Sequence, residues 1–291
     1  MTAILTERAC AKINLTLRVL GRRTDGYHEL ESLVAFASDI YDVISLDSAA
    51  PTRVSVTGPT AAYLTGKNLV EEAQTLMQSL APDEPIGALH LDKHLPIAAG
   101  IGGGSADAAA VLRIVQRAHP HVPEWQDLSS VAYKLGADVP VCFANRASIM
   151  SGIGEHLQNA VIPAACAIVL VNPQTHVPAD KTARIFSALA APEYSGYASP
   201  MSSLKFTDVD ALLSYMAEHR NDLETVASKV VLEIADMCEA LFATQGCRIA
   251  RMSGAGPTCF GLFDTIELAT DAALKLSANH PTWWIKASRL Q

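Results

Sequence analysis

A glycine run directly before an alanine-rich segment is the feature of this chain with the clearest chemistry. Residues 100–104 read Gly-Ile-Gly-Gly-Gly, and Ser105 then opens an alanine-rich stretch that continues to Leu112. Glycines allow tight turns that bring backbone N–H groups close to an anion. The unbonded N–H groups and the dipole at the start of a helix add positive potential at the same place. The pattern predicts a phosphate cradle before a helix that opens at Ser105, with a nucleoside triphosphate as its ligand.

A glycine run of this kind also has other interpretations. It can be only a flexible loop, with Ser105 as the cap of the next helix. The run is not a Walker P-loop, because no Gly-Lys-Ser/Thr follows it, and it lacks the third glycine of the dinucleotide fingerprint. The catalytic-loop and metal-binding motifs of protein kinases are not found either. The sequence therefore predicts a phosphate site outside these three families.

Composition limits the class of protein. The 291 residues are 49% hydrophobic and 18% charged, which is typical of a globular chain long enough for two domains. A net charge of −8 argues against a general binder of nucleic acid or membrane surfaces. Charged residues interrupt the start of the chain, and no apolar run approaches the roughly 20 residues of a membrane span. The six cysteines lack Cys-x-x-Cys spacing, so we expect a cytoplasmic protein with reduced thiols.

The elements that hold the glycine run can be predicted from periodicity. Apolar and polar residues alternate from Ile13 to Val19, which predicts a strand with Lys12 and Asn14 on its polar face. A helix over 127–135 is expected to stop at Gly136, where the chain turns back inward. The other elements expected in this half are strands near 33–36, 43–46, 54–56 and 88–92, and a helix over 69–80.

The pattern restarts beyond about residue 158. Its order is strand, helices, two strands, helix and strand, which is typical of a ferredoxin-like fold. Residues 192–203, rich in Pro, Ser, Gly and Ala, are predicted to be a loop. The expected elements are a strand at 167–171, helices at 180–189, 207–217 and 231–243, strands at 249–252 and 258–263, a helix at 266–276 and a strand at 283–287.

Three separated groups of residues resemble the signature regions of the GHMP small-molecule kinases, in the right order and over nearly the whole chain. They are Lys12-Ile-Asn14 with Asp25-Gly-Tyr-His28, Pro96–Ala106 with Gly136-Ala-Asp-Val-Pro140, and Gly254-Ala-Gly-Pro-Thr258. The resemblance implies an α+β fold of two domains. Residues 1–158 would form a mixed α/β domain with the glycine-rich loop, and residues 159–291 a ferredoxin-like domain.

The resemblance also implies an activity. The Asp-Gly-Tyr-His box, residues 135–140 and Asn221-Asp-Leu-Glu224 are similar to a branch of these kinases that acts on a cytidyl diphosphate sugar alcohol. Such an enzyme transfers the γ-phosphate of ATP to a hydroxyl and releases ADP. Asp138 would take the proton of that hydroxyl, and Lys12 would orient it and stabilise the developing charge. Outside this context Asp138 could be a helix or turn cap, and Lys12 an exposed strand lysine.

Binding residues follow from the same likeness. Tyr27 would stack on the cytosine and His28 would bond its edge, although a packed tyrosine beside a surface histidine would give the same sequence. Asn14 and Thr182 would contact the substrate, and for Thr182 a hydrogen bond within the first helical turn is the alternative. The residues expected at the nucleotide are Asn68, Lys93, Pro96, Ile97, Ala98, Ala99, Gly100, Ile101, Gly102, Gly103, Gly104, Ser105 and Ala106.

Magnesium is implied by the chemistry of ATP, but the sequence offers no set of carboxylates at metal spacing, so its ligands stay unassigned. Ser105 is a candidate contact to phosphate or Mg²⁺. The chain departs from the family pattern at Ala98-Ala99, Ala106 and Ala255, where glycine or serine is usual. Backbone donors are kept at these positions, so we expect the cradle to be intact but no side-chain role at Ala106.

Two other functions stay open at this point. A sister GHMP kinase could act on mevalonate-type or amino-acid alcohols, but such substrates offer no ring for Tyr27 to stack on. A nucleotide-binding regulatory protein could keep the fold without turnover, but it would not need both Lys12 and Asp138. The oligomeric state is not predicted.

Overall fold

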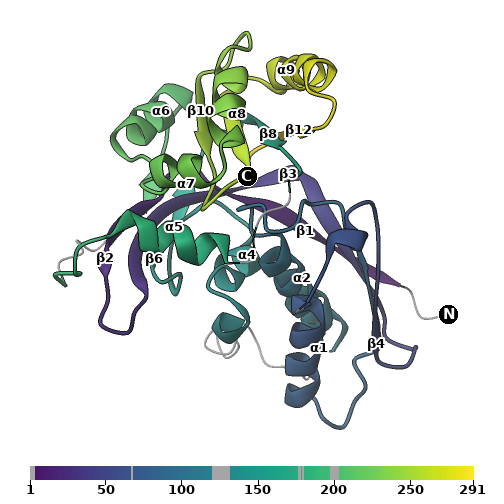
Figure 1. The fold of residues 1–291 in the computed structure, drawn as a ribbon. Helices are drawn as coiled ribbons and strands as arrows, with labels where there is room; N and C mark the ends of the chain where they lie inside the picture. Colours follow the sequence, from purple (N-terminus) through teal and green to yellow (C-terminus); the bar gives the residue numbers. More distant parts are fainter. Residues whose placement is uncertain (1–3, 67, 120–131, 176–177, 179, 197–202) are drawn as a thin grey trace. The chain divides into compact units, whose positions relative to one another are not determined.

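The computed structural model describes residues 4–66, 68–119, 132–175, 178, 180–196 and 203–291 (Figure 1). The chain divides into two compact units that are each discontinuous in sequence. The first contains Met1–Ala11, Tyr41–Ile97 and Gly102–Asn145, and the second contains Lys12–Ile40, Ala98–Ile101 and Arg146–Gln291. The chain therefore passes between the units within two strands and again within the glycine-rich loop. The division into domains at residue 158 stays a prediction.

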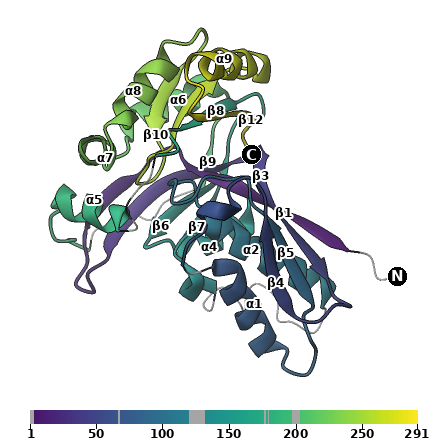
Figure 2. The same ribbon diagram turned by 45° about the vertical axis from the view of Figure 1, so that its right-hand side comes forward.

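The first unit combines part of a sheet with a helical layer. Its sheet is formed by β4 (Arg53–Thr57), β5 (Ala88–Asp92) and the second part of β3 (His28–Asp47), with β4 parallel and β3 antiparallel to β5. Its helices pack on one another, α1 on α2 and α2 on α4 (Figure 2). They are α1 (Leu69–Leu80), α2 (Gly103–Ala118) and α4 (Val139–Ala144), with short 3₁₀ turns η1 (Ala61–Tyr63) and η2 (Tyr133–Leu135).

The alanines of α2 explain how this helix fits between its neighbours. Ala106 and Ala108–Ala110 are buried together with the larger Val111, Leu112, Ile114 and Val115. Alanine is the strongest helix former and its small side chain lets helices approach closely. The sequence thus places a rigid helix directly behind the glycine run.

The second unit contains two sheets. In the first of these, β3 pairs antiparallel with β2 (Arg18–Arg22) and with β6 (Ser148–Gly152). β6 pairs with β7 (His156–Val161), which is parallel to the short β9 (Leu204–Lys205). β1 (Leu5–Asn14), of which residues 5–11 belong to the first unit, also pairs with β3.

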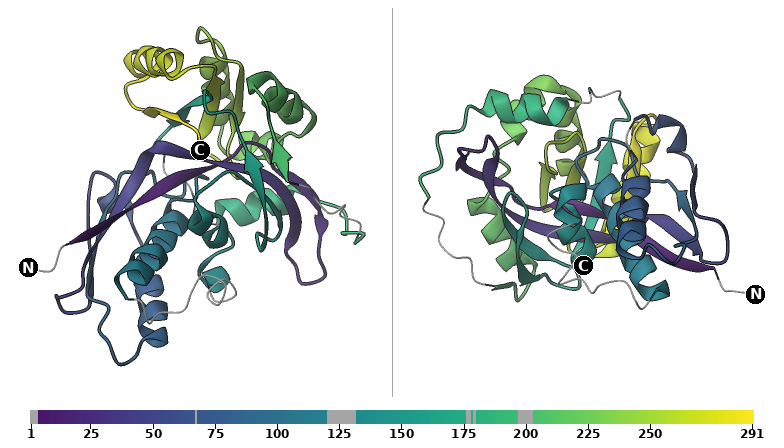
Figure 3. Two further views of the ribbon diagram at one scale, coloured as in Figure 1. Left: turned by 180° about the vertical axis from the view of Figure 1, so that it is seen from behind. Right: turned by 90° about the horizontal axis from the view of Figure 1, so that it is seen from below.

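The other sheet of the second unit has the order β10-β11-β8-β12, and all neighbouring strands are antiparallel. Ala167, Val169 and Val171 alternate along β8 toward a core that also includes residues of α8 and α9, so both helices cover the same face (Figure 3). This arrangement confirms the ferredoxin-like order. Its elements are β8 (Ala167–Asn172), α5 (Lys181–Leu189), α6 (Val209–Glu218), α7 (Glu224–Val230), α8 (Glu233–Phe242), β10 (Ile249–Met252), β11 (Cys259–Phe263), α9 (Ile266–Asn279) and β12 (Trp284–Arg289).

Several predicted boundaries were wrong. β1 ends at Asn14 instead of continuing to Val19, and one strand of 20 residues, β3, replaces the two short ones expected near 33–36 and 43–46. The alternation from Ile13 to Val19 gave the wrong boundary because it continues through Leu15 and Thr16, which lie between β1 and β2 and are as buried as Lys12 and Asn14. The helix α2 begins at Gly103 rather than Ser105.

Other elements were missed or lie partly outside the described residues. β6, β7, β9 and α7 were not predicted. Of the helix expected over 127–135, residues 127–131 lie outside the described part, and Tyr133–Leu135 is a 3₁₀ turn. The predicted loop at 192–203 has no helix or strand at 192–196, and residues 197–202 again lie outside. Within the described part, no helix is long and apolar enough to span a bilayer.

Candidate active site

Three segments that lie far apart in the sequence meet in the second unit. The backbone N–H of Lys12 donates to the carbonyl of Ile101 at 2.9 Å, and that of Thr258 donates to Ala99 at 3.1 Å. The Ser253 hydroxyl donates to the carbonyl of Gly100 at 3.0 Å. The end of β1, the first half of the glycine loop and the turn between β10 and β11 are therefore joined by hydrogen bonds to the loop backbone.

Glycine is required where the loop and this turn touch. Gly100 has φ +76°, and a Cβ there would lie 2.7 Å from the carbonyl oxygens of both Ser253 and Gly256. Gly254 has φ +55°, and a Cβ there would lie 2.9 Å from the Gly100 oxygen. Any side chain at either position would push the two backbones apart, because real Cβ atoms do not approach backbone oxygens this closely.

Lys12 and Asn14, which precede this contact, are almost completely buried. The Asn14 side-chain amide donates to the Ser32 hydroxyl at 2.7 Å, and its backbone N–H donates to the Ser253 hydroxyl at 3.1 Å. Its Oδ1 is buried and has no hydrogen-bond partner among the described residues. A buried acceptor without a donor is costly, and a ligand hydroxyl would supply the missing donor.

The second half of the loop belongs to the first unit and opens α2. Gly102 occupies the cap position with φ +63°, and no side chain caps the helix. Ser105 is therefore not the cap but a residue of the first helical turn. Because the first N–H groups of a helix without a side-chain cap keep their donor capacity and the positive end of the dipole, this end of α2 suits an anion.

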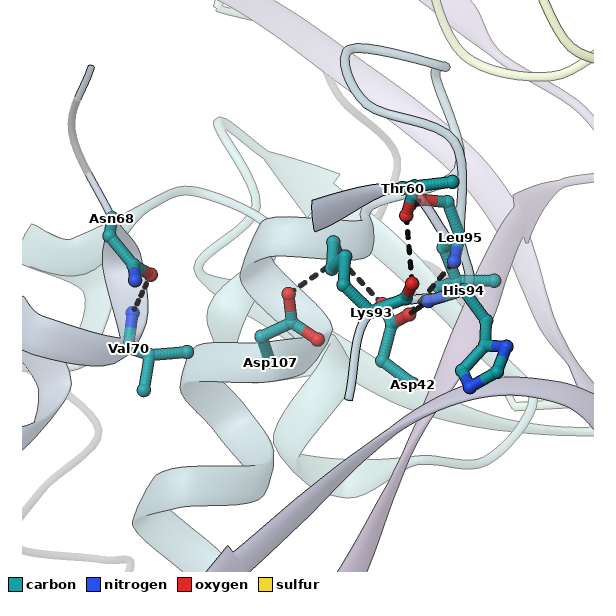
Figure 4. Close-up of polar contacts among 8 residues, drawn as sticks. All are labelled: Asp42, Thr60, Asn68, Val70, Lys93, His94, Leu95 and Asp107. Atoms are coloured by element: carbon teal, nitrogen blue, oxygen red, sulfur yellow. Dashed lines mark hydrogen bonds and ion pairs between the residues drawn. The ribbon is translucent and has the colours of Figure 1, made fainter. Parts of the chain in front are cut away.

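Asp107 of this helix belongs to a buried ion cluster with Lys93 and Asp42, which Figure 4 shows. The Lys93 ammonium lies 2.5 Å from Asp42 Oδ2 and 2.6 Å from Asp107 Oδ2, with all three side chains buried. Asp42 also accepts a bond from the backbone N–H of Leu95 at 2.8 Å. Burial lowers the pKa of Lys93, but the two carboxylates outweigh it and raise that pKa above its usual value. Burial and the nearby Asp42 carboxylate raise the pKa of Asp107. The Lys93 ammonium lowers it, but the net effect is a raised pKa.

This cluster gives Lys93 a structural task in addition to the predicted one. It stands directly before the loop, and Asp107 stands in α2 directly after it, so their ion pair ties the two ends of the loop together. The Lys93 carbonyl accepts from the Thr60 hydroxyl at 3.0 Å. Both the side chain and the carbonyl are thus bound within the first unit, and a contact between Lys93 and the nucleotide stays a prediction.

Asn68 and Asp138 both stand at helix starts. Asn68 caps α1, because its side-chain oxygen accepts from Val70 N at 3.0 Å (Figure 4), so a ligand would have to use the amide nitrogen. Asp138 occupies the cap position of α4 but makes no side-chain capping bond. A capping role does not therefore account for Asp138. A Cβ at Gly136 would lie 3.5 Å from the Ser105 hydroxyl, which brings the turn that carries Asp138 to the first turn of α2.

The residues expected at the cytosine lie at the start of β3. Tyr27 is 61% exposed, so it is not the packed tyrosine of the alternative interpretation. His28 stacks on Phe186 of α5, with ring centroids 4.9 Å apart. Burial and the neighbouring Arg22 lower the pKa of His28, which favours the neutral ring. Thr182 is exposed in the first turn of α5, one turn before Phe186.

Some residues of this site were missed in the sequence. Phe186 could have been found, because it stands four residues after Thr182 and so lies on the same face of a helix. Asp42 and Asp107 gave no local signal, since their partner comes from a distant segment.

Comparisons with known proteins identify the family. Residues 68–146 match the family described as GHMP kinases N terminal domain, and residues 201–282 match GHMP kinases C terminal. The chain is 46% identical to the 4-diphosphocytidyl-2-C-methyl-D-erythritol kinase of Methylobacterium radiotolerans over 99% of both chains. It is 42% identical to the enzyme of that name from Rhodopseudomonas palustris strain BisB18, over 98% of this chain and 95% of the relative.

Solved structures agree with this result. The crystal structure of a 4-(cytidine 5'-diphospho)-2C-methyl-D-erythritol kinase superposes with a TM-score of 0.77 at 32% identity, and covers 98% of this chain and 99% of that one. The homoserine kinase of Cytophaga hutchinsonii, at 14% identity and a TM-score of 0.68, shares the fold over 100% of this chain and 96% of its own. The chain therefore belongs to the GHMP kinases, and within them to the family of 4-diphosphocytidyl-2-C-methyl-D-erythritol kinases, which makes it an ATP-dependent small-molecule kinase.

Proposed function

We propose that this chain transfers the γ-phosphate of ATP to the 2-hydroxyl of 4-diphosphocytidyl-2-C-methyl-D-erythritol, a step of the non-mevalonate route to isoprenoid precursors. The observation that carries the proposal is the junction of Lys12, the glycine loop and the 253–258 turn by hydrogen bonds to the loop backbone. The names of the relatives support the choice of substrate.

The reaction needs a base, a cation and a cradle for the leaving diphosphate. The substrate oxygen forms a bond to the γ-phosphorus, the bond from that phosphorus to the bridging oxygen of ADP breaks, and Asp138 accepts the hydroxyl proton. Lys12 stabilises the charge that develops during transfer. The unpartnered Oδ1 of Asn14 accepts a bond from a substrate hydroxyl and holds it in place.

Recognition of the cytosine falls to the start of β3. The exposed ring of Tyr27 stacks on the base, and His28 in its neutral form bonds the edge of the base. Phe186 holds the His28 ring in position from α5, where Thr182 contacts the substrate.

The backbone of residues 96–106 would hold the nucleotide, and Mg²⁺ would be held together with its phosphates. Among the described residues there is no group of three or more His, Cys, Asp or Glu side chains that could hold a metal. In general, Mg²⁺ bound with a nucleotide keeps several waters and takes one or two protein ligands together with substrate phosphates. The Ser105 hydroxyl in the first turn of α2 is an oxygen ligand of the right kind. The ion neutralises charge on the phosphates when it is bound.

The setting of the reaction follows from its substrates. Both are small soluble anions, so we place the enzyme in the cytoplasm. The net charge of −8 gives it no general affinity for nucleic acid, and anions are bound only where local donors gather.

A coupled assay of ADP release with a panel of alcohols tests this proposal. We expect release with the cytidyl substrate and none with methylerythritol phosphate, mevalonate or homoserine. Release with mevalonate or homoserine would instead identify a sister kinase. No release with any alcohol, from folded protein that binds ATP, would point to a regulatory protein.

A further inference from the structure

Lys181, the first residue of α5, is a buried cation. The residue is 3% exposed. Its ammonium donates to the backbone carbonyl of Ala98 at 3.2 Å and to that of Gly256. No carboxylate of the described residues lies within ion-pair distance of it, in contrast to the buried Lys93. Burial lowers the pKa of Lys181 to about 8.

Such an arrangement costs folding free energy, because the ammonium loses its hydration and gains only neutral acceptors. An apolar side chain of similar length, such as methionine, would fill the space without that cost. A lysine at this position is therefore better explained by its two hydrogen bonds than by stability. Both acceptor carbonyls, of Ala98 and Gly256, belong to segments of the candidate active site.

Ala98 has a strained backbone conformation. Its φ is +52°, in the left-handed region that a residue with a Cβ adopts only at a cost. It begins the first half of the glycine loop, and each of the next three carbonyls also accepts a hydrogen bond, Ala99 from Thr258, Gly100 from Ser253 and Ile101 from Lys12. With Lys181, four groups thus donate to the carbonyls of residues 98–101. Only the Lys181 donor is a charged group, and it binds the residue with the strained backbone.

We infer that Lys181 is a positioning residue for ATP binding, because its ammonium fixes the carbonyl of Ala98 against that of Gly256 and so keeps Ala98 in the left-handed conformation. The loop then presents its backbone donors to the phosphates without having to reorder. This inference rests on the proposed role of the loop as the phosphate cradle.

The test is a double-mutant cycle between position 181 and position 98. Lys181→Met should raise the KM for ATP about tenfold, as expected for the loss of one charge-assisted hydrogen bond, while the melting temperature is unchanged or higher. Ala98→Gly alone gives the reference KM for ATP with which the double variant is compared. In the Lys181→Met background it should restore most of the loss, because glycine adopts a left-handed φ without a steric cost.

Two further variants sharpen the test. Lys181→Gln keeps N–H donors without the charge and should lie between the wild type and Lys181→Met. Lys275→Met, which removes an exposed lysine of α9, is the matched control and should behave as the wild type. If Lys181→Met fails to fold, Lys181→Gln with and without Ala98→Gly gives the same cycle.

A normal KM for ATP in the folded position 181 variants would overturn the inference. A loss that Ala98→Gly does not relieve would also overturn it, because the lysine would then act elsewhere. Gly103→Val separates this inference from the proposed function. If that variant weakens ATP binding and the position 181 variants do not, only the inference fails, whereas normal ATP binding by Gly103→Val contradicts the cradle itself.

Discussion

At the scale of single residues, the site depends on polar groups that are buried and therefore specific. Asn14 has a buried acceptor with no partner among the described residues, and the Lys93 ammonium pairs with two carboxylates. In the described part of the chain, the Lys181 ammonium donates only to backbone carbonyls. The two lysines are both buried, yet their removal should have opposite effects on stability, because only one of them neutralises buried acids.

Lys93→Met should destabilise the protein by about 3 kcal/mol, since it leaves Asp42 and Asp107 buried without their cation. Urea unfolding measures this loss. Replacing Asp107 by Asn in the same background should recover part of it, because one buried charge is then removed. A loss below about 1 kcal/mol in Lys93→Met would show that the cluster is not a source of stability.

The free energy of unfolding should depend on pH in a way that Lys181→Met abolishes. The pKa of Lys181 in the folded protein is about 8, below the ordinary value of 10.5, so between these values the unfolded chain binds more protons. The contribution of Lys181 to the free energy of unfolding is therefore most favourable above pH 10.5, where the side chain is neutral in both states. This contribution is lost as the pH falls through 8, where the buried amine becomes charged. Compared with Lys181→Met, the wild type should therefore gain stability from pH 8 to 10.5. A difference between the two proteins that does not change with pH would contradict this.

Tyr27→Ala should raise the KM for the cytidyl substrate about ten- to a hundredfold, which corresponds to the lower part of the range for base stacking. Tyr27→Phe keeps the ring and should have a small effect. Because Tyr27 is 61% exposed, neither change should affect folding. An unchanged KM in Tyr27→Ala would exclude the stacking role.

At the scale of elements, helices and strands were predicted correctly where apolar residues are buried and polar residues are exposed at a regular spacing. α1 spans residues 69–80 as expected, since its buried positions recur at helical spacing. β1 and β3 were misjudged because their polar residues face buried partners instead of water, as Asp42 faces Lys93. The cluster around Lys93 could not be predicted for the same reason, because it joins three distant elements. The glycine loop could be recognised because its sequence signal is local, and its role as a phosphate cradle stays a prediction.

The start of α2 is the element that should hold the nucleotide. Gly103→Val should weaken ATP binding about tenfold or more and leave binding of the cytidyl substrate intact, because its side chain blocks access to the first helical N–H groups. A Cβ at this position meets only ordinary contacts, the nearest being the Lys93 ammonium at 3.4 Å, so the variant should fold. Calorimetry on the folded variant checks both affinities, and normal ATP affinity would contradict this placement.

At the scale of the whole molecule, the order of the motifs along the chain is enough to predict the family, because short segments with fixed roles recur at matching positions. The division into compact units could not be read from the order of the motifs. Each unit takes residues from three stretches, and the chain leaves one for the other between Ile101 and Gly102, inside the loop itself. Within the first unit the Lys93 cluster anchors the residues that follow Gly102, and within the second unit the 253–258 turn anchors residues 98–101.

The central claim is that this chain phosphorylates its alcohol substrate with Asp138 as the base. Asp138→Asn keeps the shape of the side chain and removes the proton acceptor. The kcat for ADP release with the cytidyl substrate should fall at least about a hundredfold, within the usual range for general-base catalysis, while calorimetry shows both substrates bound as in the wild type. A kcat within about threefold of the wild type would contradict the claim and leave Lys12 and the loop to carry catalysis by positioning alone.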